Sequence, residues 1–172
     1  MVKVYNDYLN KDEHKKILDV LDSDGIAWYK SSVVVDKSGD NKGVDCQLVH
    51  SVYEANNVQS EWWDLFVPLY KKLNILIFHR IKINCSFKKN KLKMLGDYHY
   101  DYQPNNVVLK EMKIAIYYVN TTNGQTFIKE DGKIIKIDCK ANSLVTFPNT
   151  LEHTGSTHTD KDFRYVVNFN YI

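Results

Sequence analysis

Histidine and aspartate stand two residues apart in the stretch Gly96-Asp97-Tyr98-His99-Tyr100-Asp101, and both side chains are suited to binding a metal ion. Side chains at positions i and i+2 of a β-strand project from the same face, so His99 and Asp101 are expected to converge on one point. An imidazole and a carboxylate from one strand, joined by a second imidazole from elsewhere, bind iron(II) and leave three metal positions open. The stretch therefore predicts two of the three protein ligands of an iron(II) centre.

The His-x-Asp spacing is a weak signal on its own. The chain holds six histidines and repeats the pattern at His158-Thr159-Asp160, where no later histidine remains to complete a site. Three other histidines, His14, His50 and His79, have no recognisable partner and are interpreted as structural or surface residues. The rest of the chain must therefore decide between a metal site and ordinary surface polar residues.

Length and composition describe an ordinary globular chain. Its 172 residues, 44% hydrophobic and 26% charged, predict one domain with its own core. The N-terminus has no apolar segment typical of a signal peptide, and the longest apolar runs are too short to span a bilayer. The three cysteines, Cys46, Cys85 and Cys139, have no metal-ligand spacing, which favours reduced thiols in a cytoplasmic location.

Positive charge gathers in residues 71–93, although the net charge of the chain is only +2. This segment contains eight basic residues and no acidic one: Lys71, Lys72, Arg80, Lys82, Lys88, Lys89, Lys91 and Lys93. Such a run is usually a solvated face, but it also suits an acidic partner such as a nucleic acid. Both interpretations stay open.

Two helices are expected in the first half of the chain. The first covers residues 10–23, where Asn10 is a good N-cap and Glu13 completes a near capping box. The second covers about 58–75, and Pro68 should end it, kink it or force a restart. Residues 28–35 favour a strand, and a polar loop over 36–45 follows it.

From residue 80 onward the hydrophobic pattern changes from a period of 3.6 to a period of 2. The alternating runs are 80–87, 113–119, 125–128, 133–137, 143–147 and 163–171. Asp131-Gly132 between two of these runs predicts a hairpin. Helices followed by about eight short strands predict a mainly β, α+β domain in which helices pack against a β-sandwich or jelly roll.

The order of polar residues adds specificity. About fifty residues after the first His-x-Asp, Phe147-Pro148 precedes His153, and Arg164 follows eleven residues later in the last predicted strand. This order resembles the 2-oxoglutarate- and iron(II)-dependent dioxygenases, and most of all their prolyl-4-hydroxylase-like branch with its small phage and bacterial members. The resemblance covers about residues 80–171, including the strand 116–120 and the turn at 124–126.

The resemblance implies a double-stranded β-helix, a cupin-like jelly roll, over about residues 79–172, with helical support over about 1–78. It implies that His99, Asp101 and His153 bind iron. It also implies that Arg164 binds the distal carboxylate of 2-oxoglutarate, a role that suits the planar fork of a guanidinium. His158 is the alternative to His153 as the distal ligand. It stands only six residues before Arg164, however, a shorter interval than is usual in the family.

Further residues follow from the resemblance by position. Tyr118 matches a tyrosine whose hydroxyl helps to hold the same carboxylate, although a core aromatic is the alternative. Asn168 shares a face with Arg164 in the last strand and is expected to line the cosubstrate pocket, and Asn84 is a weaker candidate. The polar loop 36–45, with Gly39 and Gly43, is either a lid that closes over the site or a plain surface loop.

The activity implied is hydroxylation of a C–H bond with oxygen, coupled to conversion of 2-oxoglutarate to succinate and carbon dioxide, and ascorbate is an optional reductant. The leading substrate class is a protein or peptide side chain of prolyl type. Two alternatives remain: a nucleic-acid base demethylase, supported only by the basic segment 71–93, and a catalytically silent jelly-roll binding module. A composition rich in Lys, Asn, Ile and Tyr fits a phage, which would place the protein in the host cytoplasm.

Overall fold

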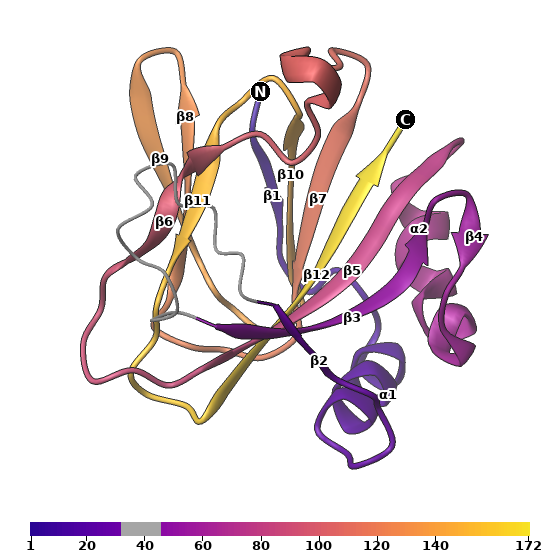
Figure 1. Cartoon of the computed structure of the whole chain (residues 1–172). Helices are drawn as coiled ribbons and strands as arrows, with labels where there is room; N and C mark the ends of the chain where they lie inside the picture. The colour runs from indigo at the N-terminus through magenta and orange to yellow at the C-terminus, as the bar shows by residue number, and fades with distance from the viewer. Residues whose placement is uncertain (32–45) are drawn as a thin grey trace.

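The computed structural model describes residues 1–31 and 46–172, which form two antiparallel sheets facing each other, with helices outside the larger sheet (Figure 1). The larger sheet has the strand order β1 (Lys3–Tyr5), β10 (Ser143–Pro148), β7 (Lys113–Tyr118), β12 (Phe163–Tyr171), β5 (Phe78–Phe87), β3 (Gln47–Glu54) and β2 (Tyr29–Ser31), and β4 (Asn57–Val58) pairs with β3. The smaller sheet has the order β6 (Met94–His99), β11 (His153–Ser156), β8 (Gln125–Glu130) and β9 (Lys133–Asp138). This arrangement confirms the predicted jelly roll of mainly β composition.

The first helix, α1 (Lys11–Leu21), begins where the sequence predicts. The Asn10 side chain accepts a hydrogen bond from the Glu13 backbone N–H at 2.9 Å, and the Glu13 carboxylate accepts one from the Asn10 N–H at 3.3 Å. The capping box is therefore complete, and it satisfies two donors that the first turn would otherwise leave free.

The second helical segment is split at Pro68, as the sequence predicts. A 3₁₀ helix, η1 (Glu61–Phe66), is followed at once by α2 (Val67–Leu73), with Pro68 in its first turn. Proline is tolerated there because the first turn has no use for its missing N–H. The segment starts later than expected because Asn57 and Val58 pair with β3 instead.

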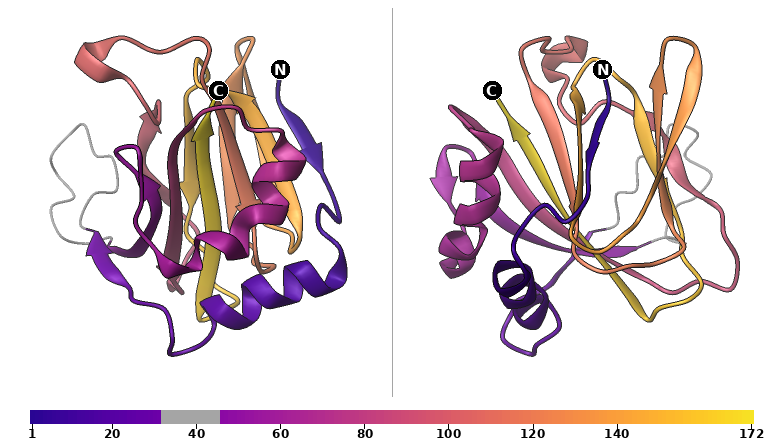
Figure 2. Two further views of the ribbon diagram at one scale, coloured as in Figure 1. Left: turned by 90° about the vertical axis from the view of Figure 1, so that its right-hand side faces the viewer. Right: turned by 180° about the vertical axis from the view of Figure 1, so that it is seen from behind.

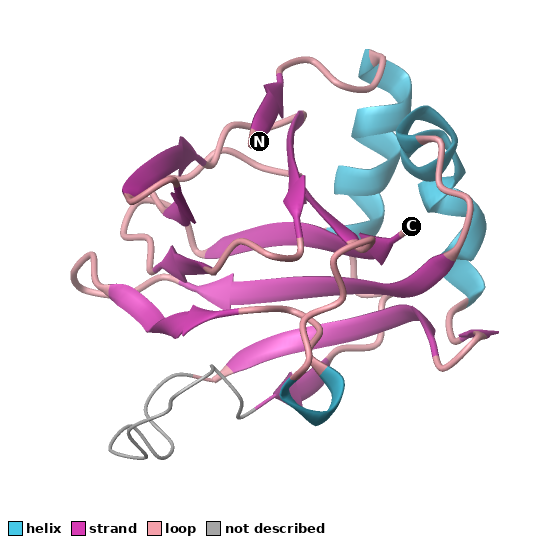
Figure 3. Cartoon of the chain, turned by 90° about the horizontal axis from the view of Figure 1, so that it is seen from above, coloured by secondary structure: helices cyan, strands magenta, loops and turns pink. Residues whose placement is uncertain are grey.

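Two apolar clusters sit on opposite faces of the larger sheet. One joins the sheet to the helices and includes Ile17 of α1, Phe66 of η1 and Leu69 of α2, all fully buried. Figures 2 and 3 show the helices on this outer face, away from the smaller sheet. The other cluster fills the space between the two sheets, with Tyr118 and Phe147 among its members. The helices thus cover the outer face and leave the inner one to line a pocket.

Several strands were not foreseen from the sequence. β1 and β3 come from the segment expected to give helical support, and they pair with β10 and β5 of the larger sheet. The predicted hairpin at Asp131-Gly132 joins β8 to β9, and both turn residues have positive φ, as a two-residue hairpin turn requires. The predicted loop 36–45, with its lid hypothesis, and the end of the strand over 28–35 lie outside the described residues.

Two further predictions, on membrane spans and on the cysteines, can be compared with the structure. No helix within residues 1–31 and 46–172 has the length and apolar character needed to cross a membrane. Cys46, Cys85 and Cys139 are all free thiols.

Candidate active site

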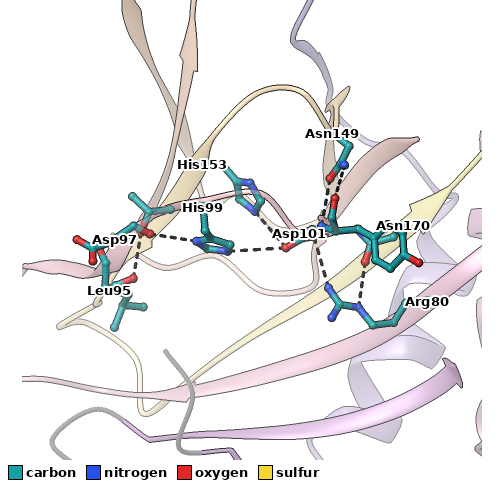
Figure 4. Close-up of polar contacts among 11 residues, drawn as sticks. Arg80, Leu95, Asp97, His99, Asp101, Asn149, His153 and Asn170 are labelled. Carbon is teal, nitrogen blue, oxygen red and sulfur yellow. Dashed lines mark hydrogen bonds and ion pairs between the residues drawn. The ribbon is translucent and has the colours of Figure 1, made fainter. Parts of the chain in front are cut away.

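The structure brings His99, Asp101 and His153 together. His99 ends β6 and His153 begins β11, and the two residues are directly paired across the smaller sheet. The Asp101 Oδ1 atom lies 3.7 Å from His99 Nε2 and 3.6 Å from His153 Nε2. One ligand atom from each side chain lies within 4.8 Å of the others, as Figure 4 illustrates. β6 stops at His99, so Asp101 reaches the cluster from the loop that follows and not from the strand itself.

The second oxygen of Asp101 is held by residues of the larger sheet. Asn170 Nδ2 donates a hydrogen bond to Asp101 Oδ2 at 2.8 Å, and Arg80 Nη2 lies 3.6 Å from the same oxygen. Arg80 Nε in turn donates to Asn170 Oδ1 at 2.9 Å, so the two side chains brace each other (Figure 4). This arrangement fixes the carboxylate and leaves Oδ1 facing the two imidazoles.

The charges of the cluster suit a divalent metal. Burial by itself would raise the pKa of the Asp101 carboxyl, but the charges of His153 and Arg80 and the hydrogen bond from Asn170 lower it to about 2. Burial, aided by His99 and Arg80, lowers the pKa of His153 to about 4, although Asp101 acts in the opposite direction. At neutral pH the site therefore offers a carboxylate and a neutral imidazole, the forms that coordinate metals.

The loop that carries Asp101 is tied to the barrel by Asn149, which is fully buried at the end of β10. Its side-chain amide donates to the Tyr102 carbonyl at 2.8 Å, and its oxygen accepts from the Tyr102 N–H at 3.3 Å. These two bonds hold the residue next to Asp101 in place. They compensate for Asp101 lying beyond the last paired residue of β6.

Arg164, the predicted 2-oxoglutarate residue, lines the same pocket of about 300 Å³ as the three-residue cluster. It is 6% exposed, and its Nη1 donates to the Ser156 carbonyl at 2.9 Å. Its Nε is buried and has no hydrogen-bond partner among the described residues. A buried guanidinium with a free donor is costly unless an anion completes it, so the residue fits a carboxylate ligand.

Gly124 gives Arg164 the room it occupies. A Cβ atom at this position would lie 2.8 Å from Arg164 Nη1 and 3.1 Å from the Thr157 carbonyl oxygen. The backbone oxygen has little freedom to retreat, so the guanidinium must shift.

Substituting alanine at Gly124 is expected to weaken 2-oxoglutarate binding by about tenfold, the loss of one charge-assisted hydrogen bond. Isothermal titration calorimetry with 2-oxoglutarate measures this effect. The protein is loaded with zinc(II), which takes the place of iron(II) and has no redox chemistry. Gly25→Ala is the matched control, because a Cβ there meets nothing closer than 3.4 Å. Equal affinities in both variants would show that Gly124 does not constrain Arg164.

Of the three other residues predicted to bind the cosubstrate, two line the pocket and one does not. Asn168 and Asn84 line it, and the Oδ1 atom of each is buried without a hydrogen-bond partner among the described residues. Tyr118 is fully buried in the core between the sheets, and its hydroxyl donates to Thr126 Oγ1 at 2.8 Å. Burial raises the pKa of this hydroxyl. Thr126, and not Tyr118, lines the pocket, so the role of Tyr118 stays a prediction.

The remaining histidines do not belong to the cluster. His158 is fully buried but belongs neither to the three-residue cluster nor to the pocket wall. His14 contacts the Tyr117 hydroxyl at 2.7 Å, and His50 lies 2.7 Å from both the Ala27 carbonyl and the Ser60 hydroxyl. His79 packs edge-on against Tyr102. These positions agree with the structural roles expected for His14, His50 and His79.

The basic segment 71–93 is divided among three places. Lys71 and Lys72 belong to α2, and Lys72 donates to the Tyr8 carbonyl. Arg80 and Lys82 point from β5 into the pocket, and the four other lysines lie between β5 and β6. An acidic partner for this segment therefore stays a prediction, and two of its cations belong to the candidate site.

Sequence reasoning missed Arg80, Lys82, Asn149 and Asn170 as site residues. A signal was present for three of them. Arg80 and Lys82 alternate with the buried Ile81 and Ile83 in β5, and Asn170 shares a face of β12 with Arg164. The alternation marks a polar face, but it does not tell whether that face meets solvent or a pocket.

Comparison with known proteins finds likeness in structure only. No family model matches the sequence, and no curated protein matches it. An oxidoreductase of the 2OG-Fe(II) oxygenase family from Burkholderia pseudomallei superposes with a TM-score of 0.69 at 12% identity, over 99% of this chain and 84% of that one. A prolyl hydroxylase from Trichoplax adhaerens, solved with a hypoxia-inducible-factor peptide fragment, gives 0.66 at 12% identity, over 99% and 83%. The viral collagen prolyl hydroxylase of Paramecium Bursaria Chlorella virus-1, in its 2OG complex, gives 0.59 at 11% identity, over 99% and 94%.

These matches establish that the chain has the fold seen in 2-oxoglutarate- and iron(II)-dependent oxygenases, as its sequence predicts. One fold hosts many reactions, so activity must be argued from the site. The residues present fit the metal and cosubstrate: two imidazoles and one carboxylate converge, and Arg164 has an unpaired buried donor in the same pocket.

Proposed function

We propose that this protein is a 2-oxoglutarate- and iron(II)-dependent dioxygenase that hydroxylates a C–H bond, with a prolyl-type peptide side chain as the leading substrate class. The observation that carries the proposal is the single pocket lined by His99, Asp101, His153 and Arg164. A three-ligand cluster alone suits many metals, and a buried arginine alone suits many anions. Their occurrence in one pocket of this fold is what favours 2-oxoglutarate as cosubstrate.

The chain's own residues have distinct tasks in this proposal. His99, Asp101 and His153 would hold iron(II), and Arg164 would bind the distal carboxylate of 2-oxoglutarate, with Tyr118 and Asn168 supporting it. When bound, the metal and cosubstrate would supply the oxidising chemistry for hydroxylation, with succinate and carbon dioxide as coproducts and ascorbate as an optional reductant. The Asn170 and Arg80 contacts keep Asp101 Oδ2 engaged, which leaves Oδ1 available on the side of the two imidazoles.

The protein also controls the surroundings of the reaction. Phe147 packs against the ring of His153 at a centroid distance of 5.0 Å, and the apolar cluster between the sheets continues behind it. This packing keeps the inner side of the cluster dry and fixes the imidazole plane. Substrate must therefore approach from the open side of the pocket.

Activity is tested by incubating the protein with iron(II), 2-oxoglutarate and either host-lysate peptides or methylated nucleic acid, followed by mass spectrometry. The expected result is a mass gain of one oxygen atom on defined peptides, together with succinate formation. Loss of a methyl group from nucleic-acid bases instead would favour the demethylase alternative. Absence of both, with metal and 2-oxoglutarate bound normally, would favour a silent binding module.

Arg164→Ala is expected to weaken 2-oxoglutarate binding by about 1.5–3 kcal/mol, the range for hydrogen bonds to a charged group, or roughly tenfold to a hundredfold. Arg164→Lys should be milder but not silent, because lysine offers a point charge without the planar fork. Isothermal titration of the zinc-loaded protein measures both. Lys136→Ala, which removes an exposed cation of β9, is the control. An unchanged dissociation constant in Arg164→Ala would remove this residue from the site.

A further inference from the structure

Lys82 is a further cation in the pocket, and its place on the strands differs from that of Arg164. In the pairing of β5 with β12, Arg164 lies opposite Ser86, whereas Lys82 lies opposite Asn168. The backbone positions of the two residues therefore lie four residues apart along the strands, about 13 Å at the usual rise per residue. Lys82 lies two residues from Arg80, at the end of the pocket that holds Asp101. It is placed beside the metal cluster and not beside the distal end of the cosubstrate.

Lys82 has no partner among the described residues, although it is partly buried. No hydrogen bond or ion pair joins it to residues 1–31 or 46–172, whereas its neighbour Arg80 is engaged with Asp101 and Asn170. Burial and the charge of Arg80 lower the pKa of Lys82, with Asp101 and Glu54 acting in the opposite direction. A partly desolvated cation without a hydrogen bond or ion pair is unfavourable, so an anion arriving from outside would be stabilised there.

The charge of the pocket also favours an anion. Among residues 1–31 and 46–172, three cationic side chains, Arg80, Lys82 and Arg164, line it, and Asp101 supplies the one carboxylate. Iron(II) and the 2-oxoglutarate dianion carry equal and opposite charges, so loading both would leave this excess unchanged. A positive excess therefore remains for the substrate to neutralise.

Asn84 adds a second recognition group next to Lys82. The two residues project from the same face of β5, and Asn84 Oδ1 is buried without a hydrogen-bond partner among the described residues. A side-chain amide accepts a hydrogen bond from an N–H or O–H, or donates one to a carboxylate. A cation beside a free amide matches a carboxylate that has an N–H group nearby, as in amino acids and peptides.

We propose that Lys82, with Asn84 beside it, binds a carboxylate of the substrate close to the carbon that is oxidised. The substrate is then a free amino acid or a peptide with an acidic residue next to the reacting side chain. This inference rests on the proposed dioxygenase function and narrows its substrate class. A carboxylate is favoured over a phosphodiester because the pocket has a volume of only about 300 Å³ and the cosubstrate shares it.

The test uses acetate and acetamide, which match in size and differ in charge. Protein labelled with ¹³C-lysine and loaded with zinc(II) and 2-oxoglutarate is titrated with each probe at constant ionic strength. The Lys82 Cε resonance, assigned by its loss in Lys82→Met, is followed by NMR. Acetate is expected to shift it saturably and to bind at least about tenfold more tightly than acetamide, the value of one charge-assisted contact. The exposed Lys136 provides the internal control.

Equal or unsaturable responses to the two probes would overturn the inference, as would tighter binding of dimethyl phosphate than of acetate. Lys82→Met should leave 2-oxoglutarate affinity unchanged, and a loss would mean that Lys82 serves the cosubstrate instead. If the wild-type protein binds neither zinc nor 2-oxoglutarate, the proposed function fails. The acetate titration then decides the role of Lys82 on the metal-free protein, so the two failures are distinguishable.

The source of the carboxylate is decided by two further probe pairs on the same zinc-loaded protein. One pair is L-proline and L-prolinamide, and the other is acetyl-Pro-Asp-amide and acetyl-Pro-Asn-amide. The member that carries the extra carboxylate in one pair should bind about tenfold more tightly, with the preference lost in Lys82→Met and kept in Lys82→Arg. A preference in neither pair would overturn the assignment of the substrate to amino acids or acidic peptides.

Discussion

Replacing His153 with alanine is expected to weaken iron(II) binding by more than about a hundredfold. Loss of a partner that merely orients a ligand already costs roughly ten- to a hundredfold in metal affinity, and loss of the ligand itself should cost more. His153 is 4% exposed and its Nε2 faces the Asp101 oxygen that is free for a metal. Among the histidines of the described residues, only His99 joins His153 in the cluster, so no third imidazole is in position to replace it.

Anaerobic titration with iron(II) and 2-oxoglutarate measures the loss of iron(II) affinity. The signal is the weak visible charge-transfer band of the iron(II)–2-oxoglutarate chelate. His158→Ala is the matched comparison, since His158 is also a buried histidine but lies outside the cluster. Circular dichroism of both variants checks that they are folded. If His153→Ala kept the band at full strength and His158→Ala lost it, the rival histidine would be the ligand.

The chain order of the cluster was predictable, because residue type and spacing carry the information. His99 and Asp101 are neighbours in sequence, and His153 and Arg164 follow at the intervals typical of a jelly roll of this kind. What the sequence does not contain is the pairing of β6 with β11, which sets His153 opposite His99 across more than fifty residues. Strand pairing depends on the packing of the whole sheet and not on local pattern.

The polar support around Asp101 was not predictable for a physical reason. Arg80 lies in an alternating strand, and alternation usually means that polar side chains face water. β5 lies inside the larger sheet between β3 and β12, and its polar face looks into the pocket. A sequence pattern has the same period in both situations, so Arg80 and Lys82 were interpreted as part of a basic surface segment.

Acid is expected to destabilise the metal-free protein through His153. An unfolded histidine titrates near pH 6.5, whereas burial lowers the pKa of folded His153 to about 4. Below pH 6.5 His153 therefore binds a proton in the unfolded chain but not in the folded one. The free energy of unfolding falls as the pH drops toward 4. The linkage amounts to about 2 kcal/mol at pH 5 and about 3 kcal/mol near pH 4, relative to pH 7. Asp101, whose pKa is about 2, loses its contribution only at lower pH.

Urea unfolding of chelator-treated protein at pH 7 and pH 5 measures this loss, and His153→Gln isolates the part due to one residue. Glutamine cannot take up a proton in this range. Between pH 7 and pH 5 the free energy of unfolding of the His153→Gln variant should therefore fall by about 2 kcal/mol less than that of the wild type. His14→Gln is the comparison for a histidine outside the cluster, hydrogen-bonded to Tyr117 and less buried than His153. Parallel pH dependences in wild type and His153→Gln would mean that His153 titrates normally in the folded protein. Its imidazole would then be accessible to protons and would not be the dry, neutral ligand that the buried position between Phe147 and Asp101 indicates.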